Sequence, residues 1–240
     1  GAGTVTKAGT GTWTLSGAST YTGATNINAG TLKLGAAGGA TNTPLGTTAA
    51  GTTVAAGATL DLNGFTLGTA EALTLNGTGI AAGGALSNSS ATAAGYSGLL
   101  TLGSASSIVA NSGDINITNA GTITGAFGLT LGGTGNGSLS SILGTTTGTL
   151  TKAGAGTWTL SGANTYSGGT TVLAGTLIGN SAAANAFGTG TITLTADATD
   201  GNTTGAISTG AGAIQNPTGA GLVTLLAAGQ IMQGGNLLDY

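Results

Sequence analysis

The sequence predicts an all-β fold, a parallel β-helix (β-solenoid) of roughly ten coils that runs as a single domain over residues 1–240. Three observations predict it: a long internal repeat, short segments in which apolar and polar residues alternate, and a composition of small residues. Gly, Thr and Ala fill 139 of the 240 positions, and 9 residues are charged. Ordinary domains carry about 25% charged residues, so this chain is unusually neutral.

The long repeat relates residues 3–32 to residues 148–177, with 22 of 30 positions identical. Weaker copies of its end recur between the two, for example in residues 51–64. Units that repeat along a chain are typical of folds in which each unit contacts only its neighbours. The matched pairs include Lys7 with Lys152, Trp13 with Trp158 and Tyr21 with Tyr166.

Strands are predicted wherever apolar residues occupy every second position, as in residues 12–15, 59–62 and 114–117. This period places alternate side chains on opposite faces of a strand. The strands should be about three to five residues long, because Gly, Asn or Ser, which favour turns, interrupt them so often. Glycine recurs too often for a helix to persist.

A solenoid fits these short strands better than a sandwich or a barrel. Asn-Gly, the strongest hairpin signal, occurs only at Asn63, Asn76 and Asn136. The small residues require a narrow cross-section. With roughly 20–24 residues per coil and about 4.8 Å between stacked strands, the chain would form a rod about 50 Å long.

The runs KAGTGTWTLSGASTYTGATNINAGTL and KAGAGTWTLSGANTYSGGTTVLAGTL closely resemble the autotransporter-associated β-strand repeat. That repeat occurs in the passenger regions of large bacterial surface and secreted proteins. The resemblance implies a right-handed parallel β-helix, export from a bacterial cell and a stalk-like or adhesive role. It implies no particular activity.

The composition excludes several classes of function. With three Lys and no Arg, no basic patch can neutralise phosphates, so nucleic acid is not an expected partner. Without Cys or His, thiol catalysis, Ser-His pairs, zinc and haem are excluded. No apolar run reaches the roughly 18 residues of a membrane-spanning helix. We therefore expect no enzyme, no cofactor and no metal site.

The acidic residues give weak candidates only. Asp197 and Asp200 could form a carboxylate pair, or bind calcium together with Asn202, but a solvated turn is the better interpretation. Alternation in residues 59–62 makes Asp61 point outward, and Asp114 is interpreted in the same way. No strict Thr-x-Thr array persists from coil to coil, which disfavours ice binding.

The repeated lysines and tryptophans each allow two interpretations. Lys7 and Lys152 could pair with an acid on an adjacent coil, but a solvated edge is the better prediction. Trp13 and Trp158 could stack on sugars, but each shares a face with the Leu two residues later. A core or groove-filling role is therefore preferred.

The two ends of the chain predict a function. The strong repeat begins within the first residues without a polar cap, and GLVTLLAAGQIMQGGNLLDY at the other end is apolar and strand-like. Uncapped solenoid ends pair with each other, and translational stacking gives an open filament. We expect an extracellular or cell-surface structural protein, such as a biofilm-matrix component. The alternative is a monomeric passenger stalk or adhesin that binds glycans or surfaces along one side.

Overall fold

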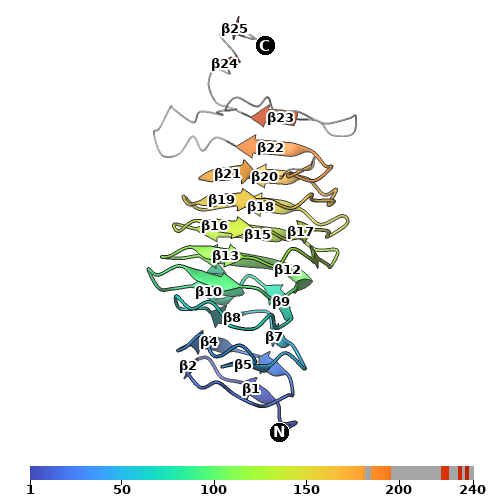
Figure 1. The fold of residues 1–240 in the computed structure, drawn as a ribbon. Helices are drawn as coiled ribbons and strands as arrows, with labels where there is room; N and C mark the ends of the chain where they lie inside the picture. The colour runs from blue at the N-terminus through green and yellow to red at the C-terminus, as the bar shows by residue number, and fades with distance from the viewer. Residues whose placement is uncertain (182–184, 196–222, 227–231, 234–235, 238–240) are drawn as a thin grey trace.

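The computed structural model describes residues 1–181, 185–195, 223–226, 232–233 and 236–237. In these residues the chain winds through about nine turns of a parallel β-solenoid, and its short strands stack along one axis (Figure 1). The predicted fold class is confirmed.

The strands form three columns, each a stack of parallel strands from successive turns. Along the chain, the strands of one turn belong to these columns one after another. The first column holds β2 (Thr12–Leu15), β4 (Gly30–Leu34), β8 (Ala58–Asp61), β10 (Leu86–Asn88), the second part of β12 (Leu100–Ala110), β15 (Leu129–Gly133), β18 (Leu150–Lys152), β20 (Thr170–Val172), β22 (Ile192–Thr195) and β23 (Val223–Leu226). The second holds β11 (Ala94–Tyr96), β13 (Ile115–Ile117), β16 (Gly137–Leu139), β19 (Thr157–Leu160) and β21 (Thr176–Gly179). The third holds β1 (Val5–Lys7), β3 (Thr25–Ile27), β7 (Thr52–Val54), β9 (Leu73–Gly77), the first part of β12, β14 (Thr122–Ile123) and β17 (Ile142–Leu143).

Three short elements lie outside the columns. They are the antiparallel pairs β5 (Asn42–Thr43) with β6 (Gly46–Thr47) and β24 (Met232–Gln233) with β25 (Asn236–Leu237), and a 3-10 turn over Ile80–Ala82. The pair β5–β6 and the 3-10 turn are insertions that lengthen their coils. Gly30 pairs with Ala58, 28 residues later, and Leu60 pairs with Leu86, 26 residues later. These coils exceed the predicted 20–24 residues, whereas Lys152 and Val172 pair at a spacing of 20.

The strand β12 differs from the prediction, because it has 11 residues rather than three to five. Its first part pairs with β9, its second part pairs with β10 and β15, and the register shifts between Leu102 and Ser106. Gly103 does not have a positive φ, so the backbone stays extended around the corner instead of turning. One strand thus belongs to two columns, which merges them into a single 14-stranded sheet.

The core consists of aliphatic side chains stacked in register. Leu32 pairs with Leu60, Leu60 with Leu86, Leu86 with Ile108 and Ile108 with Leu131. All five side chains are fully buried. Burying one such side chain contributes about 1.5–3 kcal/mol, so this ladder helps to hold five consecutive turns together.

Candidate functional site

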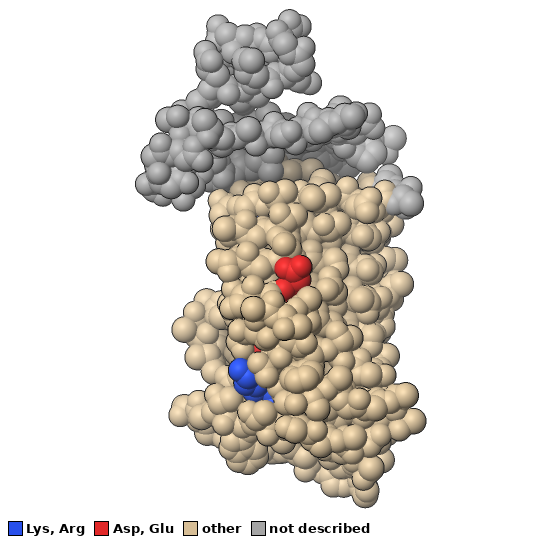
Figure 2. Space-filling model, turned by 60° about the vertical axis from the view of Figure 1, so that its left-hand side comes forward, with Lys and Arg blue, Asp and Glu red and all other residues tan. Residues whose placement is uncertain are grey.

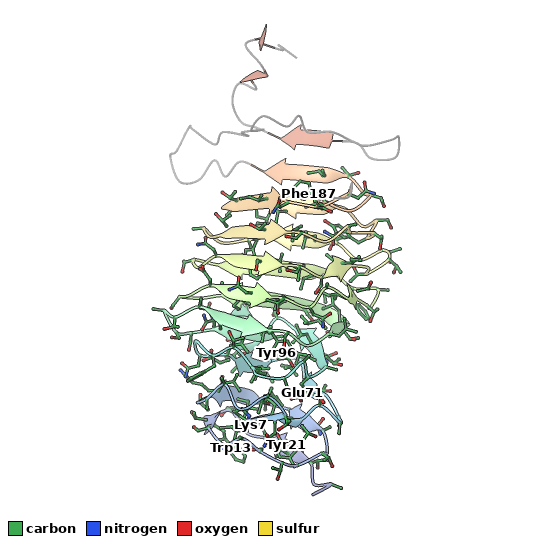
Figure 3. The ribbon with its side chains drawn as sticks, viewed as in Figure 1. Lys7, Trp13, Tyr21, Glu71, Tyr96 and Phe187 are labelled. Atoms are coloured by element: carbon green, nitrogen blue, oxygen red, sulfur yellow. The ribbon has the colours of Figure 1, made fainter. Side chains whose placement is uncertain are left out.

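The two repeat copies build the same local structures at two places on the solenoid. Figure 3 labels Lys7, Trp13 and Tyr21 of the first copy, which lie in the first turns of the rod. The copies do not occupy the same columns, because β1 lies in the third column and its counterpart β18 lies in the first. The second copy is therefore placed one column further around the solenoid axis.

Lys7 points into the solenoid and is fully buried. Its Nζ donates to the carbonyl oxygens of Ala8 at 3.1 Å, Gly9 at 2.7 Å and Ala29 at 2.9 Å. An ammonium group has three N–H donors, so all three are satisfied by backbone. The predicted solvated edge is wrong for this residue.

Lys152 repeats the arrangement in the second copy and is also fully buried. Its Nζ donates to Ala153 at 2.9 Å, Gly154 at 2.7 Å and Ala174 at 3.0 Å. Burial lowers the pKa of Lys152 to about 8. A neutral amine could act as a nucleophile, but this one is enclosed and held by three carbonyls, so the prediction of a solvated lysine is wrong here too and the group is structural.

A glycine closes each lysine site. Gly30 follows Ala29 with a φ of 69°, and Gly175 follows Ala174 with the same φ. A Cβ at either position would lie 2.7 Å from the lysine Nζ and closer still to two carbonyl oxygens. The positive φ and the close approach both require glycine.

The matched tryptophans differ in what covers them. Trp158 is fully buried, its ring lies against Gly137 of the preceding turn, and its Nε1–H donates to the Gly132 carbonyl at 3.1 Å. Trp13 is 50% exposed, and its ring centroid lies 5.7 Å from the Nζ of Lys7. The core role predicted for Trp158 agrees with its burial. For Trp13 the predicted core role is wrong, because its side chain is half exposed and β2 has β4 as its one strand partner among the described residues.

Each copy also contains a tyrosine that pairs with a threonine four residues later. The Tyr21 hydroxyl lies 2.6 Å from Thr25 Oγ1, and Tyr166 pairs in the same way with Thr170. The Thr170 hydroxyl donates to the Phe187 carbonyl, and the Thr25 hydroxyl donates to the Leu45 carbonyl. Burial raises the pKa of both tyrosines, so they act as neutral hydrogen-bonding groups.

Glu71 is the most perturbed carboxyl group among the described residues. It is fully buried, and Thr52 Oγ1 donates to its Oε1 at 2.6 Å. Its Oε2 and the Oγ1 of Thr69 have no hydrogen-bond partner although both are buried. Tyr96 donates to the backbone carbonyl of Glu71 at 2.9 Å. Burial raises the pKa of Glu71 to about 7, and its side-chain hydrogen-bond partner in the described residues is Thr52 rather than a second carboxyl group.

The other charged side chains in the described part of the chain are Lys33, Asp61 and Asp114. Lys33 and Asp61 face outward in register, as alternation predicts for Asp61, with Lys33 Nζ 3.6 Å from Asp61 Oδ2. Asp61 is nevertheless only 4% exposed, and its carboxylate accepts hydrogen bonds from both the hydroxyl and the backbone amide of Ser89. Asp114 is half-buried and accepts from the Asn136 amide. The face shown in Figure 2 is almost entirely uncharged.

The weak candidates at Asp197, Asp200 and Asn202 lie outside the described residues. Within the described ranges, no three His, Cys, Asp or Glu side chains come together as metal ligands would. In the same part of the chain, no helix has the length and apolar character needed to cross a membrane.

Sequence reasoning missed the lysine sites, the Tyr–Thr pairs and Glu71. A signal for the first two was present, because a chain with three lysines repeats one of them, followed by Ala-Gly, in both copies. The Tyr-x-x-x-Thr spacing is repeated as well. Glu71 had no such signal, since its burial depends on Thr52 and Tyr96, which lie 19 and 25 residues away.

A comparison with known protein families finds one family that matches both repeat copies. The family described as the passenger-associated-transport-repeat matches residues 5–34 and 150–178. No curated protein and no solved structure matches the chain. The family matches contain Lys7, Trp13 and Tyr21 and their counterparts, and thus each lysine site and each Tyr–Thr pair. The chain carries two copies of the passenger-associated-transport-repeat, the autotransporter passenger repeat that its sequence resembles.

Proposed function

We propose that this chain is a non-catalytic structural protein of the bacterial surface or extracellular matrix, and that it stacks end to end through its terminal turns into a filament. The two passenger repeats and the β-solenoid fit an exported passenger-type segment. Export to the cell surface or beyond is what such repeats imply.

One observation carries the filament part of the proposal. The strands β2 and β19 have the same sequence, Thr-Trp-Thr-Leu, yet β2 is exposed over most of its length while Trp158 and Leu160 of β19 are fully buried. Among the described residues, β19 lies between β16 and β21, whereas β2 is paired with β4 alone. Edge strands of this kind are templates for pairing with another chain.

The charge distribution supports the same proposal. Both repeated lysines are buried and donate hydrogen bonds to backbone carbonyls, and Lys33 is paired with Asp61. Like charges at facing ends would oppose stacking, and almost none remain on the described surface. A non-catalytic role is supported by the acidic residues that the structure describes, Asp61, Glu71 and Asp114, because they make no contact with one another in its hydrogen bonds, whereas most glycoside hydrolases act through a pair of acids.

Negative-stain microscopy over a concentration series, with mass determination in solution, tests the proposal. Long fibres one solenoid wide that grow with concentration are the expected result. Monodisperse short rods at all concentrations would contradict it.

The second candidate is a monomeric passenger stalk or adhesin that binds glycans or surfaces along its side. Leu99 and Phe127 favour it, because both side chains are 41% exposed in the middle of the solenoid rather than at an end. If the rods are monodisperse, binding to a glycan array that Phe127→Ser weakens would support this second function.

A further inference from the structure

Glu71 lies in a connecting segment that belongs to no strand. Residues 67–72 precede β9, and their side chains alternate between buried and exposed along the segment. Thr69 and Glu71 are buried, and the residues on either side of each are exposed. Residues 69–71, which we call the Glu71 corner, therefore form an outer layer of the solenoid with two polar side chains turned inward.

Side chains of the neighbouring turns hold the Glu71 corner in place. Tyr96, which lies on the next turn (Figure 3), donates to the Glu71 carbonyl at 2.9 Å, and Ser97 Oγ donates to the Thr69 carbonyl at 3.3 Å. From the preceding turn, Thr52 Oγ1 donates to Glu71 Oε1 at 2.6 Å. The strand that follows is held differently, because β9 pairs through its backbone with β7 and β12. The corner can therefore move outward without breaking these ladders.

The Glu71 corner buries polar atoms that it does not satisfy. Glu71 Oε2 and Thr69 Oγ1 are both buried, and neither has a hydrogen-bond partner in the described structure. An ionised carboxylate accepts hydrogen bonds through both of its oxygens, whereas Thr52 donates to one oxygen of Glu71 only. The site thus suits the neutral carboxylic acid better than the carboxylate.

The groups that face Glu71 would not compensate a negative charge. The titratable side chains near enough to respond to it are Tyr21 and Tyr96. Burial raises the pKa of both phenols, and a negative charge on Glu71 raises it further, so both stay neutral. The three lysines are engaged elsewhere, two by backbone carbonyls and one by Asp61. Ionisation of Glu71 in place would therefore bury an unpaired charge, which is strongly unfavourable.

We infer that the Glu71 corner is a pH-operated latch: a proton on Glu71 keeps residues 69–71 inside the solenoid, and loss of that proton releases them while β7 and β9 stay paired. Release brings the carboxylate to water and breaks the three hydrogen bonds from Thr52, Tyr96 and Ser97. Local opening of this kind needs less free energy than unfolding of the whole chain. The latch goes beyond the proposed structural role and does not depend on filament formation.

A thiol at position 69 measures the opening directly, because the chain contains no cysteine. Thr69→Cys places a buried thiol in the Glu71 corner and removes no hydrogen bond of the Thr69 side chain. Ala70→Cys, exposed in the same segment, gives the labelling rate of an open thiol at each pH. Val54→Cys, buried in β7, reports whether the paired strands open as well. The probe is a pyridyl disulfide, which labels thiols in acid as well as at neutral pH.

Relative to Ala70→Cys, the labelling of Thr69→Cys should accelerate about ten-fold per pH unit between pH 5 and pH 7, because opening releases one proton. Glu71→Gln in the same background should abolish this acceleration, since the amide does not ionise. At both pH values the Val54→Cys chain should be labelled far more slowly than the Thr69→Cys chain.

The latch is refuted if the relative labelling of Thr69→Cys does not change between pH 5 and pH 7, or if its acceleration persists with Glu71→Gln. Equal labelling of Thr69→Cys and Val54→Cys would also overturn it, because the strands would then open together with the corner. Should a cysteine variant fail to fold, hydrogen exchange of residues 68–72 against β9, with and without Glu71→Gln, makes the same comparison. These readouts need no fibres, so their outcome is separate from that of the filament proposal.

Discussion

At the scale of single residues, the two buried lysines are stabilised by backbone dipoles rather than by a carboxylate. Each ammonium group joins three carbonyl oxygens, two from the residues that follow it and one from the next turn. Hydrogen bonds to charged groups contribute more than neutral ones, so the lysine ties two turns together at their corner.

Replacing Lys152 with Met should therefore destabilise the chain although it removes a buried charge. The substitution leaves three buried carbonyl oxygens without their donor, and a buried unsatisfied group costs about 1–3 kcal/mol. We expect the free energy of unfolding to fall by about 2–4 kcal/mol, measured by urea denaturation followed by circular dichroism.

The matched control for this variant is Lys33→Met, which removes the partly exposed member of the Lys33–Asp61 pair. Lys33 is partly exposed, and the Asp61 carboxylate keeps the hydrogen bonds from Ser89, so the loss of stability should be smaller than for Lys152→Met. A Lys152→Met protein as stable as this control would show that the carbonyl contacts contribute nothing.

Glu71 makes the stability depend on pH. Burial raises the pKa of Glu71 from 4.5 to about 7, so between these values the folded chain retains a proton that the unfolded chain has lost. The free energy of unfolding should therefore fall as pH rises from 4.5 to 7, by about 3 kcal/mol at 1.4 kcal/mol per pKa unit. Thermal unfolding at pH 5 and pH 8 measures the difference.

Glu71→Gln should remove this pH dependence and raise the stability at pH 8, because the amide is neutral at both values. Asp114→Asn serves as the control, since Asp114 is a half-buried carboxylate with an amide donor from Asn136. If the control flattens the pH profile and Glu71→Gln does not, another group is responsible.

At the scale of elements, glycine decides how closely two turns approach. A Cβ on Gly137 would lie 2.6 Å from the Trp158 ring, whereas a Cβ on Gly17 would have one neighbour, Ser19 Oγ at 3.9 Å. We expect Gly137→Ala to lower the free energy of unfolding by about 1–3 kcal/mol through overpacking, and Gly17→Ala to change it little. Denaturant unfolding of both variants, followed by circular dichroism, tests this difference.

The elements also show which parts of the structure the sequence could predict. Alternation predicted the strands, and the repeat predicted the stacking, because both signals are local or nearly exact. The burial of Lys7 could not be predicted by alternation, since a period of two gives the side of the strand but not the carbonyls of Ala29 on the next turn. The strand β12 is long because Gly103 has a φ outside the positive range and does not end the strand. The sequence does not show which glycines adopt a positive φ, so this length could not be predicted.

At the scale of the whole molecule, each turn is stabilised mainly by its two neighbours. The leucine ladder and the parallel pairing join adjacent turns only. In such quasi-one-dimensional folds the stability is a sum of unit and interface contributions. A turn that lacks one neighbour should consequently open more often than an internal turn.

The identical segments 11–18 and 156–163 allow this to be measured without correction for sequence. Their intrinsic amide exchange rates are nearly equal, so a difference in hydrogen exchange reports structure alone. We expect the amides of residues 12–15 to exchange orders of magnitude faster than those of residues 157–160, because β2 is an edge strand and β19 is enclosed on both sides. Peptides 10–19 and 155–164 differ in mass at their ends, which lets mass spectrometry separate them. Equal protection in a dilute, monomeric sample would contradict a stability that depends on neighbouring turns, whereas protection of residues 12–15 that rises with concentration would indicate that a second chain covers this edge.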